Sequence, residues 1–352
     1  MRNWIAIVVL IVGAGCIREV EDFNNQLTVR NVVVYGTLND TDGPHMLTVG
    51  RIERLNSSAG NAPVSNLQTV ELHDEAGNRW IYLPSGAGTY EIPRGILTPQ
   101  TGTAYRVVVR DADLGIDVVS QFETMPPRVD IDAVELRVER LEVSNALGQV
   151  RDEYLIEATV TSTLPDVPTN LRWEVEHVYS FPEIPVPNCP LCPPPATCYF
   201  SERPDFPGGR FYNGFAFPAD RVEQTIGRTE LDDERFGSRF YFNVYQHSIS
   251  PRALRYFEEV ELIKAQGGLF DVPPGAVLGN LVNQRDDELV LGYFQVGPTD
   301  TLRVFATPPD LTPFPLQPVC PLNLSNDPAD YPQQCFRCEE IPNASFDRPW
   351  YF

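Results

Sequence analysis

Lysine is almost missing from this 352-residue chain: Lys264 is the only lysine among 27 basic residues. With 48 acidic residues, the formal net charge is −21. Nucleic acids and anionic bilayer surfaces repel a protein of this charge, so neither is an expected partner. A hydrophobic content of 42% is enough for real cores, which excludes a chain that is disordered throughout.

The familiar catalytic signatures are also missing. The chain has no G-x-S-x-G elbow, no H-E-x-x-H pair, no Walker loop and no dinucleotide fingerprint. Its four histidines, His45, His73, His177 and His247, stand in four separate strand or turn contexts. We therefore expect no enzyme, no cofactor and no metal centre, although dispersed residues can still build an active site. The acidic stretch 39–43 is predicted to form a hairpin turn, with a weak calcium site as the alternative.

No apolar run is long enough for a membrane-spanning helix, which needs about 20 residues. The longest candidate, Trp4 to Val12, is short, follows Arg2 and precedes Gly13, Ala14, Gly15 and Cys16. This order is typical of a secretory leader, and small residues before a cysteine resemble a bacterial lipobox. We expect residues 1–15 to be a lipoprotein signal peptide and 16–26 a tether acylated at Cys16, with Gly13 departing from the usual leucine. An ordinary leader or an uncleaved anchor is the alternative.

The other six cysteines agree with export. Three lie in a proline-rich loop and three near the C-terminus: Cys189, Cys192, Cys198, Cys320, Cys335 and Cys338. An even number in an exported chain predicts disulfides, whose connectivity the sequence leaves open. The two C-x-x-C pairs also have zinc-ligand or redox spacing, but an oxidising compartment and their wide separation favour disulfides.

The spacing of strand-like segments predicts a mostly β protein. Residues 27–125 hold seven short segments rich in Val, Ile, Thr and Tyr, separated by turns with Gly, Asn, Asp and Pro. This pattern predicts an immunoglobulin-like β-sandwich. Residues 126–352 predict a larger β-rich domain with a Cys/Pro-rich loop at 182–198, one amphipathic helix at 251–266 and a disulfide-stapled tail. Ser250, Pro251 and Gly267 frame that helix.

Aromatic residues give the best hint of a binding site. Phe211, Tyr212, Phe215 and Phe217 crowd a glycine-containing segment beside the cysteine loop. Exposed aromatics on flexible backbone are suited to bind a peptide, a glycan or a partner protein. The alternative is that they fill the gap between the two domains.

Several motifs together resemble a known family. They are the cysteine at the end of the leader and the segments VVVYGTLNDTDGPHMLTVGR, GTYEIP, FETMPP, LRWEVEHVYSF, VYQHSISPRALRYFEEV, GGLFDVPPGAVLGNLVN, VLGYFQVG, CFRC and RPWYF. The chain is similar to Bacteroidota cell-envelope lipoproteins classed as a domain of unknown function and commonly encoded beside TonB-dependent receptors. The resemblance implies an accessory lipoprotein at the surface or periplasmic face of the outer membrane.

The expected function is therefore non-enzymatic. We expect a lipid-anchored outer-membrane protein that binds a ligand for, or docks on, a TonB-dependent uptake receptor, because loops on a rigid β scaffold commonly carry recognition. A structural component of the envelope and a surface hydrolase are the two alternatives.

Overall fold

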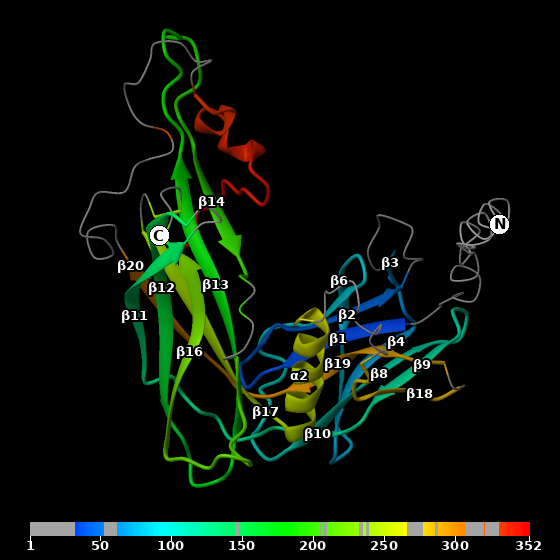
Figure 1. The fold of residues 1–352 in the computed structure, drawn as a ribbon. Helices are drawn as coiled ribbons and strands as arrows, with labels where there is room; N and C mark the ends of the chain where they lie inside the picture. Colours follow the sequence, from blue (N-terminus) through cyan, green and yellow to red (C-terminus); the bar gives the residue numbers. More distant parts are fainter. Residues whose placement is uncertain are drawn as a thin grey trace, which may run out of the picture.

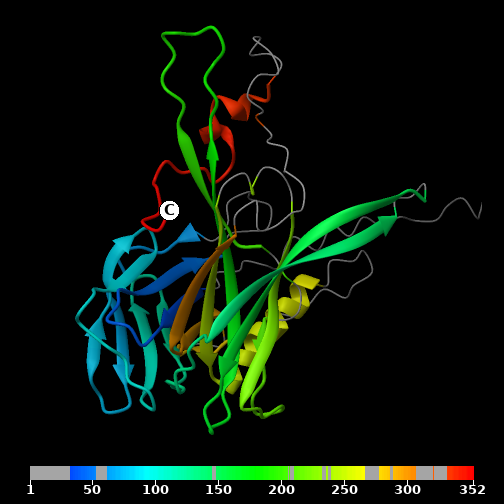
Figure 2. The ribbon, with the colours of Figure 1, turned by 90° about the vertical axis from the view of Figure 1, so that its left-hand side faces the viewer.

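The computed structural model describes residues 32–52, 62–144, 148–204, 206, 210–231, 235–236, 239–265, 277–285, 288–306, 320 and 331–352. The expected signal peptide, the tether and Cys16 lie outside these residues. Two β bodies form an L, with helix α2 (Pro251–Ala265) in its corner (Figures 1 and 2). The fold is mostly β, as the sequence predicts, and α2 is the one α-helix in the described part. No helix among these residues has the length and apolar character needed to span a membrane.

The N-terminal body packs two sheets face to face. The first sheet has the order β19-β1-β2-β7-β6 with β3 beside β2, and the second has the order β18-β9-β8-β4-β5 with β10 beside β8. Their strands are β1 (Val32–Leu38), β2 (His45–Arg51), β3 (Ala62–Pro63), β4 (Thr69–Asp74), β5 (Arg79–Ile81), β6 (Leu83–Gly86), β7 (Thr89–Ile92), β8 (Ala104–Asp111), β9 (Ile116–Ser120), β10 (Glu123–Thr124), β18 (Leu281–Asn283) and β19 (Leu291–Val296). Val107 and Val109 of β8 point into the shared core, as alternation predicts.

Two strands of this body come from far along the chain. β18 pairs antiparallel with β9, and β19 pairs parallel with β1. Phe294 and Val296 of β19 join the N-terminal core. Residues 281–296, which the sequence analysis placed in the C-terminal domain, thus belong to the first body. Two parallel strands are joined by a long crossover and not by a short hairpin turn. The sequence around β19 therefore does not show that its partner is β1.

The C-terminal body also packs two sheets. One has the order β11-β12-β16, and the other has the order β14-β13-β17-β20 with β15 beside β13. Their strands are β11 (Ala133–Ser144), β12 (Val150–Thr163), β13 (Asn170–Pro182), β14 (Thr197–Glu202), β15 (Phe211–Tyr212), β16 (Arg221–Glu230), β17 (Phe240–Ile249) and β20 (Thr299–Ala306). Trp173, Phe240 and Phe242 are fully buried between the two sheets.

Arg128 joins the two bodies. Its guanidinium contacts Asp40 of the β1–β2 turn at 2.9 Å, Asp130 at 2.6 Å and Asp300 of β20 at 2.8 Å. The Asp40 carboxylate of the acidic stretch 39–43 therefore has an arginine partner in a hairpin turn. Helix α2 adds a second link, because Leu254 and Tyr256 pack on Tyr293 of β19.

Helix α2 begins and runs as its sequence predicts. The Ser250 hydroxyl accepts a hydrogen bond from the Ala253 N–H at 3.1 Å, and Pro251 takes the first helical position. Lys264 in the last turn pairs with Glu261 at 3.0 Å. The helix is described as far as Ala265, and the predicted last residue 266 and the predicted closing Gly267 lie outside the described residues.

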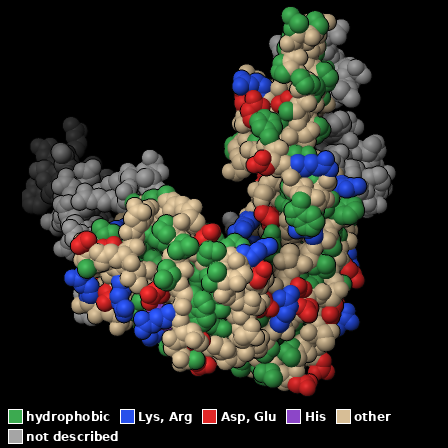
Figure 3. Space-filling model, turned by 180° about the vertical axis from the view of Figure 1, so that it is seen from behind, with side chains coloured by type: hydrophobic (Ala, Val, Ile, Leu, Met, Phe, Trp, Pro, Cys, Tyr) green, Lys and Arg blue, Asp and Glu red, His purple; other side chains and the backbone are tan. Residues whose placement is uncertain are grey.

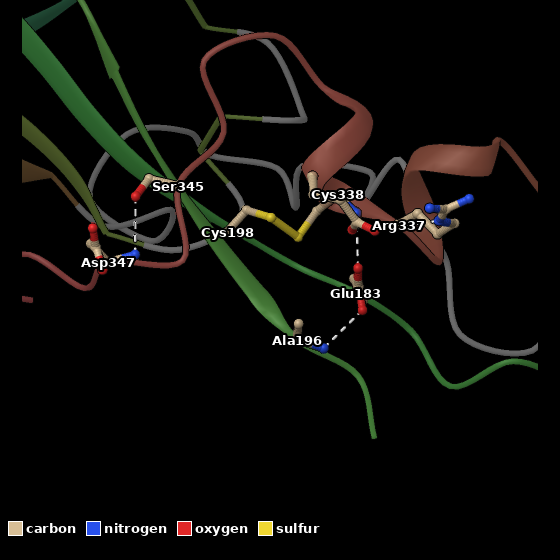
Figure 4. The surroundings of a disulfide bond; sticks show 8 residues. Glu183, Ala196, Cys198, Arg337, Cys338, Ser345 and Asp347 are labelled. Carbon is tan, nitrogen blue, oxygen red and sulfur yellow. Dashed lines mark hydrogen bonds and ion pairs between the residues drawn. A yellow bond between two sulfur atoms is a disulfide. The ribbon is translucent and has the colours of Figure 1, made fainter. Parts of the chain in front are cut away.

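All six cysteines in the body form disulfides, as predicted: Cys189–Cys192, Cys198–Cys338 and Cys320–Cys335. The Cys198–Cys338 bond ties β14 to the tail, which carries the short helices η3 (Gln333–Cys335) and η4 (Cys338–Glu340). Beside this bond, the Glu183 carboxylate accepts hydrogen bonds from the N–H groups of Ala196 and Cys338, both at 2.8 Å (Figure 4). The tail is thus fixed to the base of the β13–β14 hairpin.

Candidate functional site

The predicted aromatic segment divides into two pairs. Phe211 packs beside helix α2, and Tyr212 packs against the C-terminal core, both as part of β15. Phe215 and Phe217 lie in the turn that follows and are 58% and 71% exposed. Tyr212 also lines a pocket of about 220 Å³ formed with residues 164–169 and 218–220. The four residues therefore do not form one platform.

A polar sheet face lies in the corner beside this segment. We call it the inner face: the side chains of β13, β17 and β20 that point away from the C-terminal core. By strand alternation and register its polar and aromatic members include Arg172, Glu174 and Glu176 of β13, Tyr241, Asn243, Tyr245 and His247 of β17, and Thr299, Thr301, Arg303 and Phe305 of β20. Figure 3 shows the hollow between the two bodies, with basic side chains gathered at its corner.

An ion pair occupies the end of the inner face next to α2. Arg172 Nη2 lies 2.6 Å from Glu174 Oε1, and the side chains are 19% and 26% exposed. The Arg172 guanidinium stacks on the Phe257 ring of α2 at 3.9 Å. Burial lowers the pKa of Arg172 below its ordinary value, while Glu174 opposes that shift. Burial also works against ionised Glu174, but Arg172, the protonated form of His247, and Arg203 hold its pKa below the ordinary value.

His247 completes this end of the face as a neutral imidazole. Its Nδ1 lies 2.9 Å from the Thr299 hydroxyl, and its Nε2 lies 3.9 Å from Glu174 Oε1. Burial lowers the pKa of His247 to about 4, against the attraction of Glu174. At neutral pH the ring thus adds no charge next to Arg172.

Two buried N–H donors beside Arg172 have no hydrogen-bond partner within the described residues. One is Gln295 Nε2, whose amide oxygen accepts from Arg172 Nη1 at 3.4 Å. The other is Arg210 Nε; Arg210 directly precedes Phe211, and its charge is close enough to Arg172 to help lower the pKa of Arg172. Both atoms donate, so the complementary group is an oxygen acceptor.

The other end of the inner face is covered by the end of the chain. The Tyr351 hydroxyl accepts from Asn243 Nδ2 at 3.1 Å, and the Tyr241 hydroxyl donates to the Tyr351 carbonyl at 2.9 Å. Arg303 lies 3.8 Å from the Tyr351 ring centroid. Glu176 accepts from Tyr245 at 2.8 Å, and burial together with this bond raises the pKa of Tyr245 to about 12.

The arrangement suits binding better than acid–base catalysis. Thr299, His247 and Glu174 follow the order of a nucleophile, a base and an orienting carboxylate. However, the 3.9 Å between Glu174 and His247 exceeds a hydrogen bond, and Glu174 pairs with Arg172 instead. A histidine with a pKa near 4 is also a weak base at neutral pH.

A group with metal-ligand spacing lies away from this face. Glu183, Cys338 and Glu339 bring one ligand atom each within 4.8 Å of one another. The Cys338 sulfur is bonded to Cys198 and is therefore no thiolate, and Glu183 already accepts two backbone hydrogen bonds. The group is best explained as the support of a disulfide.

The inner face is not among the sites predicted from the sequence, although the sequence carries a signal for it. In the segment 171–176, Arg172, Glu174 and Glu176 alternate with apolar residues, which is the pattern of a strand with one polar face. Of the four histidines, His247 lies on the inner face, whereas His177 points into the C-terminal core. The alternation does not show which strands pair with β13 or which side chains meet Arg172, because β17, β20 and Gln295 come from much later in the chain.

The comparison with protein families identifies the family of this chain. The profile of the domain of unknown function DUF4249 matches residues 19–303, which is most of the chain. The chain belongs to this family. All residues of the inner face except Phe305 lie inside the matched range. Because the family has no assigned activity, membership gives the site no chemistry of its own.

Other comparisons add little. A comparison with curated proteins finds no match. Among solved structures, the B domain of a biofilm-associated protein is 9% identical, covers 80% of this chain and 88% of its own, and has a TM-score of 0.12. A score of that size supports no structural argument.

Proposed function

We propose that this member of the DUF4249 family is a non-enzymatic binding protein of the cell envelope that holds the free carboxylate of a peptide at the inner face. The observation that carries the proposal is the buried donor Gln295 Nε2, whose amide oxygen contacts Arg172, together with the buried donor Arg210 Nε, on a residue whose charge acts on Arg172. An unsatisfied buried donor costs about 1–3 kcal/mol, and an oxygen acceptor on a ligand recovers that free energy. Guanidinium groups favour a carboxylate among such acceptors.

Calorimetric titration of the mature protein tests this proposal. We expect trialanine to bind and trialanine amide, which lacks the carboxylate, to bind at least about tenfold more weakly, since a hydrogen bond to a charged group contributes about 1.5–3 kcal/mol. Arg210→Gln should cause a loss of similar size. Arg228→Gln is the matched control, because Arg228 pairs with Glu157 on the other sheet. Equal binding of acid and amide, or binding of maltotriose alone, would contradict a peptide-carboxylate site.

The proposal places the protein at the outer membrane, lipid-anchored through Cys16, as an accessory of a TonB-dependent uptake receptor. The leader and the small residues before Cys16 support the anchor. Three disulfides support an oxidising compartment. Labelled palmitate should enter the native protein and not a Cys16→Ser variant, and a receptor should co-purify with the native protein from detergent extracts. Recovery of unlabelled native protein from the cytosol would refute this part.

A further inference from the structure

The tip of the β13–β14 hairpin, residues 184–196, projects beyond both bodies (Figures 1 and 2). No Asp, Glu, Lys or Arg occurs between Glu183 and Glu202, although the chain as a whole has a net charge of −21. Leu191 at the end of the tip is 95% exposed, and Pro193, Pro194 and Pro195 beside it are exposed as well. Figure 3 shows hydrophobic side chains at this end and charged ones only below it.

The tip is held in one shape. Prolines occupy six of its thirteen positions, namely 185, 187, 190, 193, 194 and 195, and they fix the backbone angle φ. The Cys189–Cys192 disulfide closes the turn that presents Leu191. At its base, Ile184 N–H donates to the Cys335 carbonyl at 2.8 Å. A segment ordered before it binds loses little conformational entropy on binding.

The net charge of the chain and the amino-acid composition of the tip indicate which kind of partner the tip can bind. A second copy of the chain would bring together two strongly acidic molecules, and the tip has no basic group to offset their repulsion. A bilayer is disfavoured because the tip lacks the Lys, Arg and Trp that anchor segments at headgroups, and Leu191 is its one large aliphatic side chain that is exposed. Exposed consecutive prolines and a leucine fit an apolar groove lined by aromatic side chains.

We propose that the tip docks into such a groove on a partner protein, with Leu191 inserted and the 193–195 prolines lying along it. This interaction goes beyond the ligand site described above and uses different residues. The ligand titrations therefore test one proposal and the tip variants the other, so that either can fail alone.

Photo-crosslinking in native envelopes tests the proposal. A photoreactive amino acid is placed at position 191 of the full-length lipoprotein and, as a matched control, at position 262, where Leu262 of α2 is 59% exposed. We expect one protein to be trapped from position 191 and not from 262, with the trapped residue among aromatic side chains of that protein. With the purified partner, Leu191→Ser should weaken affinity about tenfold to a hundredfold, and Leu262→Ser should leave it unchanged.

The other outcomes overturn the proposal. Adducts with lipid alone, with a second copy of this chain, or with the same protein from both positions each contradict a protein groove specific for the tip. Absence of any adduct from position 191 does so too. Because Leu191 is almost fully exposed, its replacement should leave the thermal unfolding temperature unchanged, which separates lost docking from lost folding.

Discussion

Buried polar side chains in the C-terminal core differ in how many of their hydrogen-bonding atoms have a partner. Gln246 accepts from the indole N–H of Trp173 and from Ser162, both at 2.7 Å, and donates to the Val129 carbonyl at 2.8 Å. His177 is equally buried, but neither of its ring nitrogens has a hydrogen-bond partner among the described residues. It packs instead between the rings of Phe240 and Phe242, with centroids 5.0 and 4.8 Å away. His177 is thus a core residue that acid can charge.

The pH dependence of stability should reveal this histidine. Burial, with a smaller contribution from Arg235, lowers the pKa of His177 from 6.5 to about 3. The unfolded state therefore binds a proton below pH 6.5 that the folded state refuses until about pH 3, so stability falls as pH falls through this window. One such proton changes the unfolding free energy by about 1.4 kcal/mol per pH unit.

The variant His177→Phe fits the aromatic surroundings and removes the proton site. We expect the unfolding free energy of the variant, measured by urea titration between pH 6.5 and 4, to fall less steeply than that of the native protein. His73→Phe is the control, because the His73 ring keeps a hydrogen bond to Glu71 at 2.7 Å and lies outside the aromatic cluster around His177. Parallel pH profiles for native protein and His177→Phe would refute the assignment.

At the scale of elements, local patterns predict individual strands and the helix, but not all of their partners. The start of α2 follows from Ser250 and Pro251, which are neighbours in sequence. The strand character of β19 is also local, whereas its pairing with β1 depends on a backbone approach that only the folded chain creates. Gly292 marks this approach: a Cβ there would lie 2.1 Å from the Val34 carbonyl oxygen.

Replacing this glycine should disrupt the return strand. Gly292 has φ +96°, where residues with a side chain are strained, and the Cβ would collide with backbone that cannot move aside easily. We expect Gly292→Ala to lower the unfolding free energy by more than about 3 kcal/mol, measured by urea titration. Gly86→Ala is the matched control, since its Cβ would meet only Thr89 at 3.7 Å and the change should stay within about 0.5 kcal/mol. Equal losses in the two variants would contradict this account.

At the scale of the whole molecule, the sequence predicts which residues and strands the two bodies contain better than it predicts which of them pair with one another. Cysteine number and the expected export predict disulfides, but not that Cys198 reaches Cys338 rather than a nearer cysteine. Likewise, the charges of Arg172 and Glu174 are visible in the sequence, whereas Gln295 reaches them only because β19 belongs to the other body. The contact between Arg172 and Gln295 therefore exists only because the chain returns to the first body, and local periodicity does not predict that return.

The disulfides should contribute to stability according to the length of chain they close. Cys198–Cys338 spans 140 residues and is fully buried, whereas Cys189–Cys192 spans three residues at the exposed tip. In the chain-entropy relation, the long loop contributes about 5 kcal/mol and the short one about 2 kcal/mol. We expect the double variant Cys198→Ala/Cys338→Ala to lose clearly more unfolding free energy in urea than Cys189→Ala/Cys192→Ala. Equal losses in the two double variants would contradict this dependence of stability on the length of the closed loop.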